Sequence, residues 1–285
     1  MTQFDRQYRL AIGPPGKSGF EVGEIPPGKA SALHISFNVS KADTETPNTA
    51  TISLWNLNPE HLAIINTPNA IVALRAGYGT HIPLAFAGAI TYTETSMDEG
   101  DRETRIEAVD GMVALRDVFV SMSYSGKINN KKIISDVAVE MGVAVTFSYN
   151  APFTDLPTGF SYVGAAKGAL DKACASSGLQ WQLHNGTLQV KRKGDTMSRE
   201  VYVLSSDSGL IGIPKKITFA AGGNYPDEQS GWEVQYLLNG AIGIGDYIRL
   251  ESKYVKGYFQ PRSIELGGDN LEGDWLAVAK LVDAV

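Results

Sequence analysis

Alternating apolar and polar residues mark the first third of the chain. From Leu33 to Val39, and again from Ala50 to Leu54, every second residue is apolar. A period of two is typical of β-strands with one buried face. We therefore expect two strands joined by a polar loop. Asn58-Pro59 then predicts the start of a short helix, because asparagine caps a first turn and proline fits its first position.

The same reasoning extends the β region on both sides of this pair. Further strands are expected at residues 8–12, 20–22, 70–76, 83–95 and 103–109. Alternate small residues between Ala85 and Ala89 suit a tightly curved sheet or a closely packed neighbour. With the short helix, these strands are enough for a small closed barrel before Gly111.

A helical period replaces the alternation after about Val120. Asn130 is expected to cap a helix that runs through Met141, and Ser161 to cap a second helix that ends at Gly178. The second helix would bury Val163, Ala166, Leu170, Ala173 and Cys174. Strands are expected at residues 143–147, 179–183 and 188–190, the last two joined by an Asn-Gly turn. This order predicts a compact α+β unit.

From residue 200 the chain is rich in β pattern again, after a charged stretch at 191–199 that we expect to be a linker. Strands are expected at residues 201–204, 216–220, 232–237, 247–252, 257–266 and 275–285. The predicted fold class is α+β, mostly β. Three domains are expected: a β-barrel at 1–118, a small α+β insert at 119–199 and a second β-barrel at 200–285.

Composition narrows the function. The chain of 285 residues has a formal net charge of −6, which argues against sequence-specific binding to duplex DNA. One cysteine excludes an internal disulfide framework. No apolar run approaches the ~20 residues of a membrane span. The first residues lack the apolar core of a secretory signal, so we expect synthesis in the cytosol.

Two short motifs imitate binding sites. GPPGKS at Gly13–Ser18 is similar to a phosphate-binding loop, but Ala11 stands where that signature needs glycine, and Gly19 and two prolines follow instead of a helix. A hairpin turn is the favoured interpretation. GGDNLEGD at Gly267–Asp274 is similar to one calcium-binding repeat, and a single copy lacks the ligands that stacked repeats share. We expect a turn there too.

Three further kinds of residue could carry chemistry: clustered carboxylates, histidine or cysteine, and aromatic residues. Asp98, Glu99, Asp101 and Glu103 could form a carboxylate pair, but a hairpin tip would keep them solvated. The four histidines have no ligand spacing; His34 is expected to be exposed, and Cys174 to lie in a core. The aromatic residues could form a sugar platform, but they are spread over many strands and are expected in cores and interfaces. No catalytic, cofactor-binding or metal site is predicted.

Three stretches together resemble a known family. F-x-V-x-K at Phe37–Lys41 precedes N-T-A-x-I-S-L-W-N-L at 48–57, and GAIGIGDYIRLES at 240–252 precedes KGYFQPRSIELGGDNLEGDW at 256–275. Between them, residues 127–143 and 168–190 are similar to the small α+β module that such proteins carry. The combination resembles the baseplate hub proteins of contractile-tailed bacteriophages.

This resemblance implies two tube-type barrels per chain and a homotrimer with a six-fold-like ring of barrels. The ring would join the hexameric tail tube, or tube-initiator proteins, to a trimeric spike, contact other baseplate proteins, and let DNA pass. It implies a structural protein in the virion tail baseplate, with no enzyme activity and no cofactor. A net acidic chain suits a channel that DNA must not stick to.

Two other functions stay open. The chain could be another tail ring or tube-initiator component, for which one barrel per chain in a hexamer would speak. It could also be a cell-wall glycan-binding or hydrolase module, which would need a further domain with a catalytic site. The three expected domains leave no room for that domain in 285 residues.

Overall fold

The computed structural model describes residues 5–23, 32–43, 47–98, 100–111, 117–192, 195–197, 201–221 and 227–284. The chain forms two compact units. Unit 1 combines Met1–Asp110 with Glu200–Val285, and unit 2 is Gly111–Arg199. Each unit has a hydrophobic core of its own. Among the described residues, no helix is both long and apolar enough to cross a membrane.

Unit 1 is built from two runs of strands. The first run is β1 (Arg6–Gly13), β2 (Phe20–Gly23), β3 (Ile35–Ala42), β4 (Thr49–Trp55), β5 (Ile71–Tyr78), β6 (Leu84–Asp98) and β7 (Asp101–Val109), with helix α1 (Pro59–Ile65). The second run is β15 (Val201–Ser205), β16 (Leu210–Phe219), β17 (Gln229–Leu237), β18 (Tyr247–Glu251), β19 (Lys256–Asp269) and β20 (Trp275–Asp283). Every strand expected in these two regions is present.

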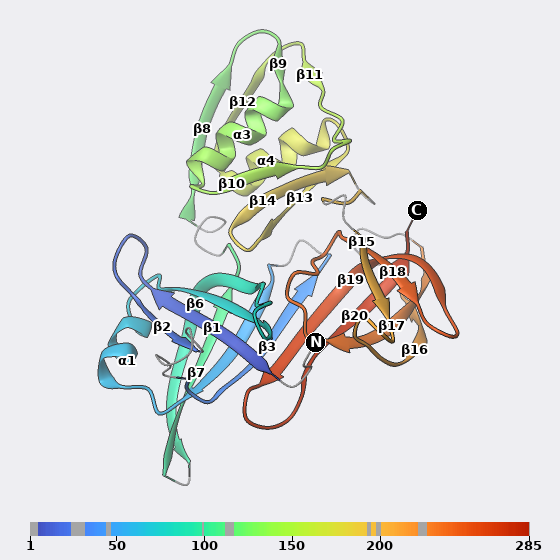
Figure 1. Ribbon diagram of the computed structural model, residues 1–285. Helices are drawn as coiled ribbons and strands as arrows, with labels where there is room; N and C mark the ends of the chain where they lie inside the picture. Colours follow the sequence, from blue (N-terminus) through green and yellow to red (C-terminus); the bar gives the residue numbers. More distant parts are fainter. Residues whose placement is uncertain are drawn as a thin grey trace. The chain divides into compact units, whose positions relative to one another are not determined.

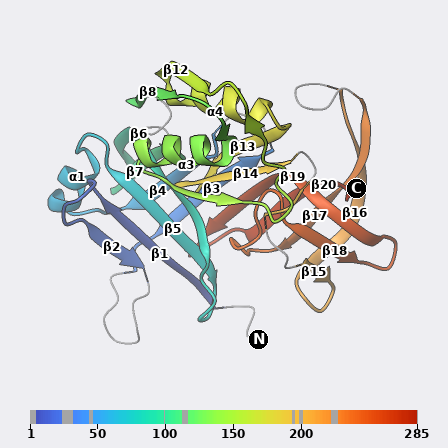
Figure 2. The ribbon, with the colours of Figure 1, turned by 90° about the horizontal axis from the view of Figure 1, so that it is seen from above.

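One sheet connects both runs. Its strand order is β16-β17-β20-β19-β3-β4-β7-β6-β5-β1-β2, and β18 pairs with β19 and with β15 off this path. Figure 2 shows β2, β1 and β5 side by side, as their antiparallel registers require. The β15–β18 pair is parallel. The sheet therefore continues from the N-terminal strands into the C-terminal ones.

The β3–β4 pair shows why the sequence folds this way. Ile35 pairs with Leu54 and Val39 with Ala50, and all four side chains are buried on one face. Alternation over both strands thus puts every apolar side chain into the core. The Asn58 side chain accepts a hydrogen bond of 2.7 Å from the backbone N–H three residues later and caps α1, as expected.

Unit 2 is the α+β unit. It contains β8 (Phe119–Tyr124), β9 (Ile128–Asn129), α3 (Asn130–Glu140), β10 (Ala144–Phe147), β11 (Asp155–Leu156), β12 (Phe160–Ala165), α4 (Ala166–Ala175), β13 (Leu179–His184) and β14 (Thr187–Arg192). Figure 1 shows both helices between the sheet β10-β14-β13 and the β8–β12 pair, and α4 contacts β13 on one side and β8 and β12 on the other. The predicted fold class, mostly β with a small α+β unit between two β parts, is confirmed.

Four local predictions for this unit were wrong. The second helix begins at Ala166, and Ser161 lies in β12, which pairs along its whole length with β8. Val163 is 66% exposed on that strand and is not part of the core. The cap of α3 is Asn129, whereas Asn130 is fully buried. The expected linker is part strand, since Lys191 is a buried residue of β14; residues 193–194 and 198–199 lie outside the described ones.

Candidate assembly surfaces

The pairing of β3 with β19 joins the two β parts of unit 1. Ser36–Ala42 and Ser263–Asp269 form an antiparallel ladder of seven residue pairs. The core behind this ladder is shared by both parts and includes Ile35 and Leu266, neither of which is exposed. We call this junction the seam. Because backbone pairing and core packing both cross it, the two parts form one body.

Trp275 fixes the seam at one end of β20. Its ring is 3% exposed and packs edge-on against Phe37, with 5.2 Å between ring centroids. Its indole N–H donates to the Gly77 carbonyl at 3.0 Å, and the Tyr78 hydroxyl donates to the Trp275 carbonyl at 2.6 Å. A Cβ at Gly268 would lie 2.6 Å from both rings, so the absence of a side chain there permits the close packing. One tryptophan thus connects the C-terminal part to β3 and β5.

The GGDNLEGD segment forms the turn between β19 and β20. The Asp269 carboxylate accepts hydrogen bonds from the N–H groups of Leu271 and Glu272, both at 2.9 Å, and lies 3.0 Å from His34 Nε2. Partial burial would raise the pKa of Asp269, but the hydrogen bonds from the Glu272 N–H and His34 outweigh it and lower that pKa. Arg6 donates to the Asp269 carbonyl at 2.7 Å. The turn prediction is confirmed, and its carboxylate stabilises the seam.

A buried polar cluster lies at the other end of β3, and sequence reasoning missed it. Lys41 is 1% exposed, and burial lowers its pKa to about 8, although Asp110 and Asp246 favour its charged form. The Asn48 amide donates to Asp110 at 3.4 Å. Neither Lys41 Nζ nor the Tyr236 hydroxyl has a hydrogen-bond partner among the described residues. The alternation of β3 was the available signal, because it places position 41 on the inward face.

Four stretches of strand edge in unit 1 have no pairing partner among the described strands. They are the outer edges of β2, β15 and β16, and the part of β6 beyond residue 90. The edges of β2 and β15 are four and five residues long, whereas β16 has ten residues. The β6 edge runs from Thr91 to Asp98, because β5 pairs only with Leu84–Ala89. Such edges are templates for pairing with another chain.

The two longer edges also expose apolar side chains. Figure 1 shows the hairpin of β6 and β7 projecting beyond α1. On β6, Tyr92 is 49% and Met97 77% exposed, and on β16 Ile213 is 63% exposed. Lys215 and Lys216 beside it are exposed as well. Both edges therefore combine hydrogen-bonding backbone with apolar side chains, as protein interfaces do.

The acidic cluster of the sequence lies at the tip of this hairpin, as expected. Asp101 is exposed and accepts a hydrogen bond of 3.0 Å from the Asn56 amide, and Glu103 is half-buried. Glu99 and the side chain of Asp98 lie outside the described part. The described part of the cluster is a solvent-exposed turn, where water keeps carboxylates from the burial that acid–base catalysis needs.

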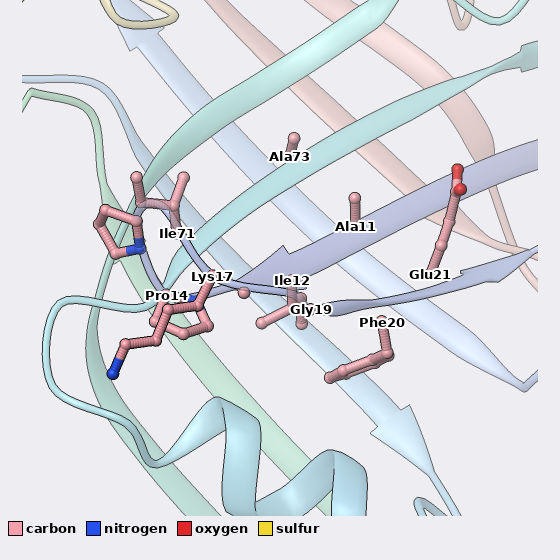
Figure 3. Close-up of a pocket in the computed structure, with 11 residues that line it drawn as sticks. Ala11, Ile12, Pro14, Lys17, Gly19, Phe20, Glu21, Ile71 and Ala73 are labelled. Carbon is pink, nitrogen blue, oxygen red and sulfur yellow. The ribbon is translucent and has the colours of Figure 1, made fainter.

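The GPPGKS motif forms the turn between β1 and β2. The N–H of Lys17 donates to the Pro14 carbonyl at 3.2 Å, and β2 follows where a nucleotide site would need a helix. Figure 3 shows the shallow pocket beside this turn, of about 440 Å³. Its lining is largely apolar and includes Ile12, Phe20 and Ile71. The hairpin prediction is confirmed, and the lysine lies on a turn without the backbone cradle that phosphate binding needs.

The surroundings of Cys174 and His34 indicate a role in packing for both residues. Cys174 is buried in unit 2, and burial raises the pKa of its thiol to about 12, so the reactive thiolate is disfavoured. The prediction of an exposed His34 was wrong, because its ring is half-buried and stacks on Trp55 at 3.8 Å. No three His, Cys, Asp or Glu side chains come together as a metal site in the described part of the chain.

The aromatic residues do not form one platform. Tyr236, Phe259 and Trp275 are core residues, as expected, whereas Tyr254 and Tyr258 are 64% and 54% exposed on the C-terminal part. The described aromatic residues are thus dispersed between core and surface, which does not favour a sugar platform.

The chain is similar to known proteins over most of its length. Residues 61–255 match the family model described as baseplate hub gp41. No curated protein matches the sequence. Among solved structures, the chain is similar to the 43 kDa tail protein of prophage MuSo2 from Shewanella oneidensis, with 12% identity, a TM-score of 0.60 and 97% of each chain covered.

Two further solved structures are similar to the chain. The E. coli c3393 protein is described as a type VI secretion component with structural similarity to the T4 tail proteins gp27 and gp5; identity is 11%, the TM-score 0.61, and 91% of this chain and 76% of that chain are covered. A chain of the Francisella PdpA-VgrG complex gives 9% identity, a TM-score of 0.60, and coverage of 98% and 58%. These likenesses show that the chain shares the fold of these proteins.

Proposed function

We propose the function of this chain from one premise: it belongs to the baseplate hub gp41 family. A baseplate hub works by assembly in the tail of a phage particle. The finer proposal is that three copies form a ring of pseudo-six-fold symmetry, which connects the hexameric tail tube to the trimeric spike. Synthesis in the host cytoplasm precedes this assembly.

The main observation that supports the proposal is the seam between β3 and β19. A three-membered ring matches a six-membered tube only if each chain presents two comparable β surfaces in a fixed relation. The parts at residues 1–118 and 200–285, which we propose as the two tube-type domains, share one sheet through β3 and β19 and one core. Since core packing does not deform continuously, three such bodies present six surfaces at constant spacing.

The proposed partners lie on the two faces of this ring. Tube or tube-initiator proteins would bind one face, and the spike and other baseplate proteins the other. The similarity to a chain of a PdpA-VgrG complex supports this arrangement, since that protein occurs in an assembly. Obligate interfaces of this kind bury more than ~2,000 Å² and are apolar at their centres.

Passage of DNA is part of the proposal. With 31 acidic and 25 basic residues, the chain is net negative, and an acidic channel lining would repel the phosphate backbone. A ring structure with a neutral or basic lining would contradict this point.

The chain is proposed to have no catalytic function. The family is one of baseplate hubs, the MuSo2 relative is a tail protein, and the acidic hairpin tip and the Cys174 surroundings do not support catalysis. A cell-wall hydrolase or glycan-binding role is the remaining alternative of another class. Clearing of a purified cell-wall suspension by the protein would establish that alternative.

Mass measurement of the purified protein tests the hub proposal. A mass of three chains, and rings with six lobes in electron micrographs, are expected. A hexamer with one lobe per chain would instead indicate another tail ring or a tube initiator. An assembly whose chain number is not a multiple of three would contradict the trimeric ring.

A further inference from the structure

The two long free edges of unit 1 carry opposite charge. The free stretch of β6 carries Glu94 and Asp98, and three more acidic residues and one arginine follow at the hairpin tip and the start of β7. Residues 210–219, which form β16, contain two lysines and no acidic residue. Like charges on facing edges repel, and opposite charges steer association and fix register. The acidic edge of one copy is therefore complementary to the basic edge of another.

Length and side chains agree with this match. The β6 edge from Thr91 to Asp98 has eight residues, and β16 has a continuous run of five, Lys215–Phe219, after the bulge that contains Pro214. Five residues are about one strand of average length. Tyr92 and Met97 on the first edge and Ile213 on the second would lose their exposure in such a pair. The edge of β2 has only four residues, and that of β15, with five, carries no charge.

The two edges lie at different parts of one rigid body. β16 ends the strand order on the C-terminal side, and β6 belongs to the N-terminal part across the seam. A contact between unlike surfaces of identical chains is heterologous, and it closes into a ring when the rotation permits. Lys215 lies 3.6 Å from Glu233 of its own chain, a loose and exposed ion pair that leaves the ammonium available.

We infer that β6 of one copy, from Tyr92 to Asp98, pairs edge to edge with β16 of the next copy, and that this β-pairing holds the ring together. The inference rests on the proposed hub function and names the surfaces by which the copies meet. The partner is a second copy of this chain.

Charge reversal on one edge is the test. Lys215→Glu together with Lys216→Glu should raise the dissociation constant of the trimer more than about tenfold, because like charges then face each other. The matched control is Lys253→Glu with Lys256→Glu, which makes the same charge change at exposed lysines away from the edge. The control should assemble as the unchanged protein does. Mass photometry or light scattering over a dilution series gives the constants, and circular dichroism checks folding.

Reversal of the second edge should restore assembly. Adding Glu94→Lys and Asp101→Lys to the Lys215/Lys216 variant brings opposite charges together again, so the constant should return towards that of the unchanged protein. A carbodiimide, which joins lysine to carboxylate only in direct contact, should link β16 to residues 94–103 between isotopically light and heavy copies. Links inside one chain only would contradict the inference.

The outcomes separate the two proposals. If the unchanged protein forms trimers and the Lys215/Lys216 variant forms them equally well, edge pairing is wrong and the hub function stands. If the unchanged protein forms no trimer, alone or with its spike, both are wrong. Loss of the trimer with recovery in the combined variant supports edge pairing.

Discussion

Removal of the Trp275 side chain should lower the free energy of unfolding of unit 1 substantially. The ring is nearly fully buried against Phe37 and its N–H is bonded to the Gly77 carbonyl. Truncation of a buried tryptophan to alanine costs about 3–5 kcal/mol, since packing is lost and a cavity remains. For a unit of this size each kcal/mol moves the melting temperature by about 2–4 °C, so Trp275→Ala should lower it by roughly 6–20 °C.

Differential scanning calorimetry measures this effect. Trp275→Phe keeps an aromatic ring but loses the indole hydrogen bond, and should cost only about 1–2 kcal/mol. Trp181→Ala in β13 identifies the transition of unit 2, which Trp275→Ala should leave in place. Tyr254→Ala, at a side chain that is 64% exposed, is the control and should cost less than about 0.5 kcal/mol. A shift for Trp275→Ala no larger than that control would refute the reasoning on the seam.

Three further predictions concern buried polar groups. The pKa of Lys41 is about 8 in the folded protein and 10.5 in the unfolded chain, so the unfolded chain binds more protons between these pH values. This residue therefore makes the free energy of unfolding rise with pH by up to roughly 3 kcal/mol. Urea unfolding of Lys41→Met over this pH range should lack that rise, and the same rise in the variant as in the unchanged protein would contradict the prediction. Tyr8→Phe removes a hydroxyl that bonds both the carbonyl and the N–H of Leu33, and should lower stability by about 1–3 kcal/mol in the same assay; no change would show that water replaces the hydroxyl. Asn130→Ala should destabilise unit 2 by about 1–3 kcal/mol, because the buried Asn130 side chain accepts a hydrogen bond from the Thr154 N–H. Asn129→Ala should cost about 1 kcal/mol, because it removes the cap of α3. Equal losses of stability in the two variants would argue against the buried contact.

The sequence predicted those elements whose periodicity is long and whose ends are marked. The β3–β4 pair, the cap of α1 and the strands after residue 200 follow from local pattern alone. The prediction of a helix start at Ser161 was wrong, because six residues directly before a helix have too little periodicity to distinguish a strand from a first helical turn. Pairing with β8 makes residues 160–165 a strand. Assignment of the cap to Asn130 instead of Asn129 was an ambiguity between neighbours of the same type.

Long-range features were beyond local pattern. The local pattern does not show the register of β3 against β19. That register depends on tertiary contacts, namely packing around Trp275 and the turn stabilised by Asp269. The buried Lys41 was predictable in position but not in environment, because Asp246 reaches it from another part of the chain. The free edges of β6 and β16 likewise became visible only when the strand order was known.

The register of β3 against β19 has a consequence for biosynthesis. The partner of β3 leaves the ribosome about 220 residues after β3 itself, which takes roughly 10–45 s at ordinary translation rates. During that time the hydrogen-bonding groups of β3 on that side are uncovered, while unit 2, whose contacts are local, can already fold. A nascent chain of this kind therefore exposes a pairing edge to aggregation until β19 has emerged, and chaperone binding to β3 during that interval should raise its yield.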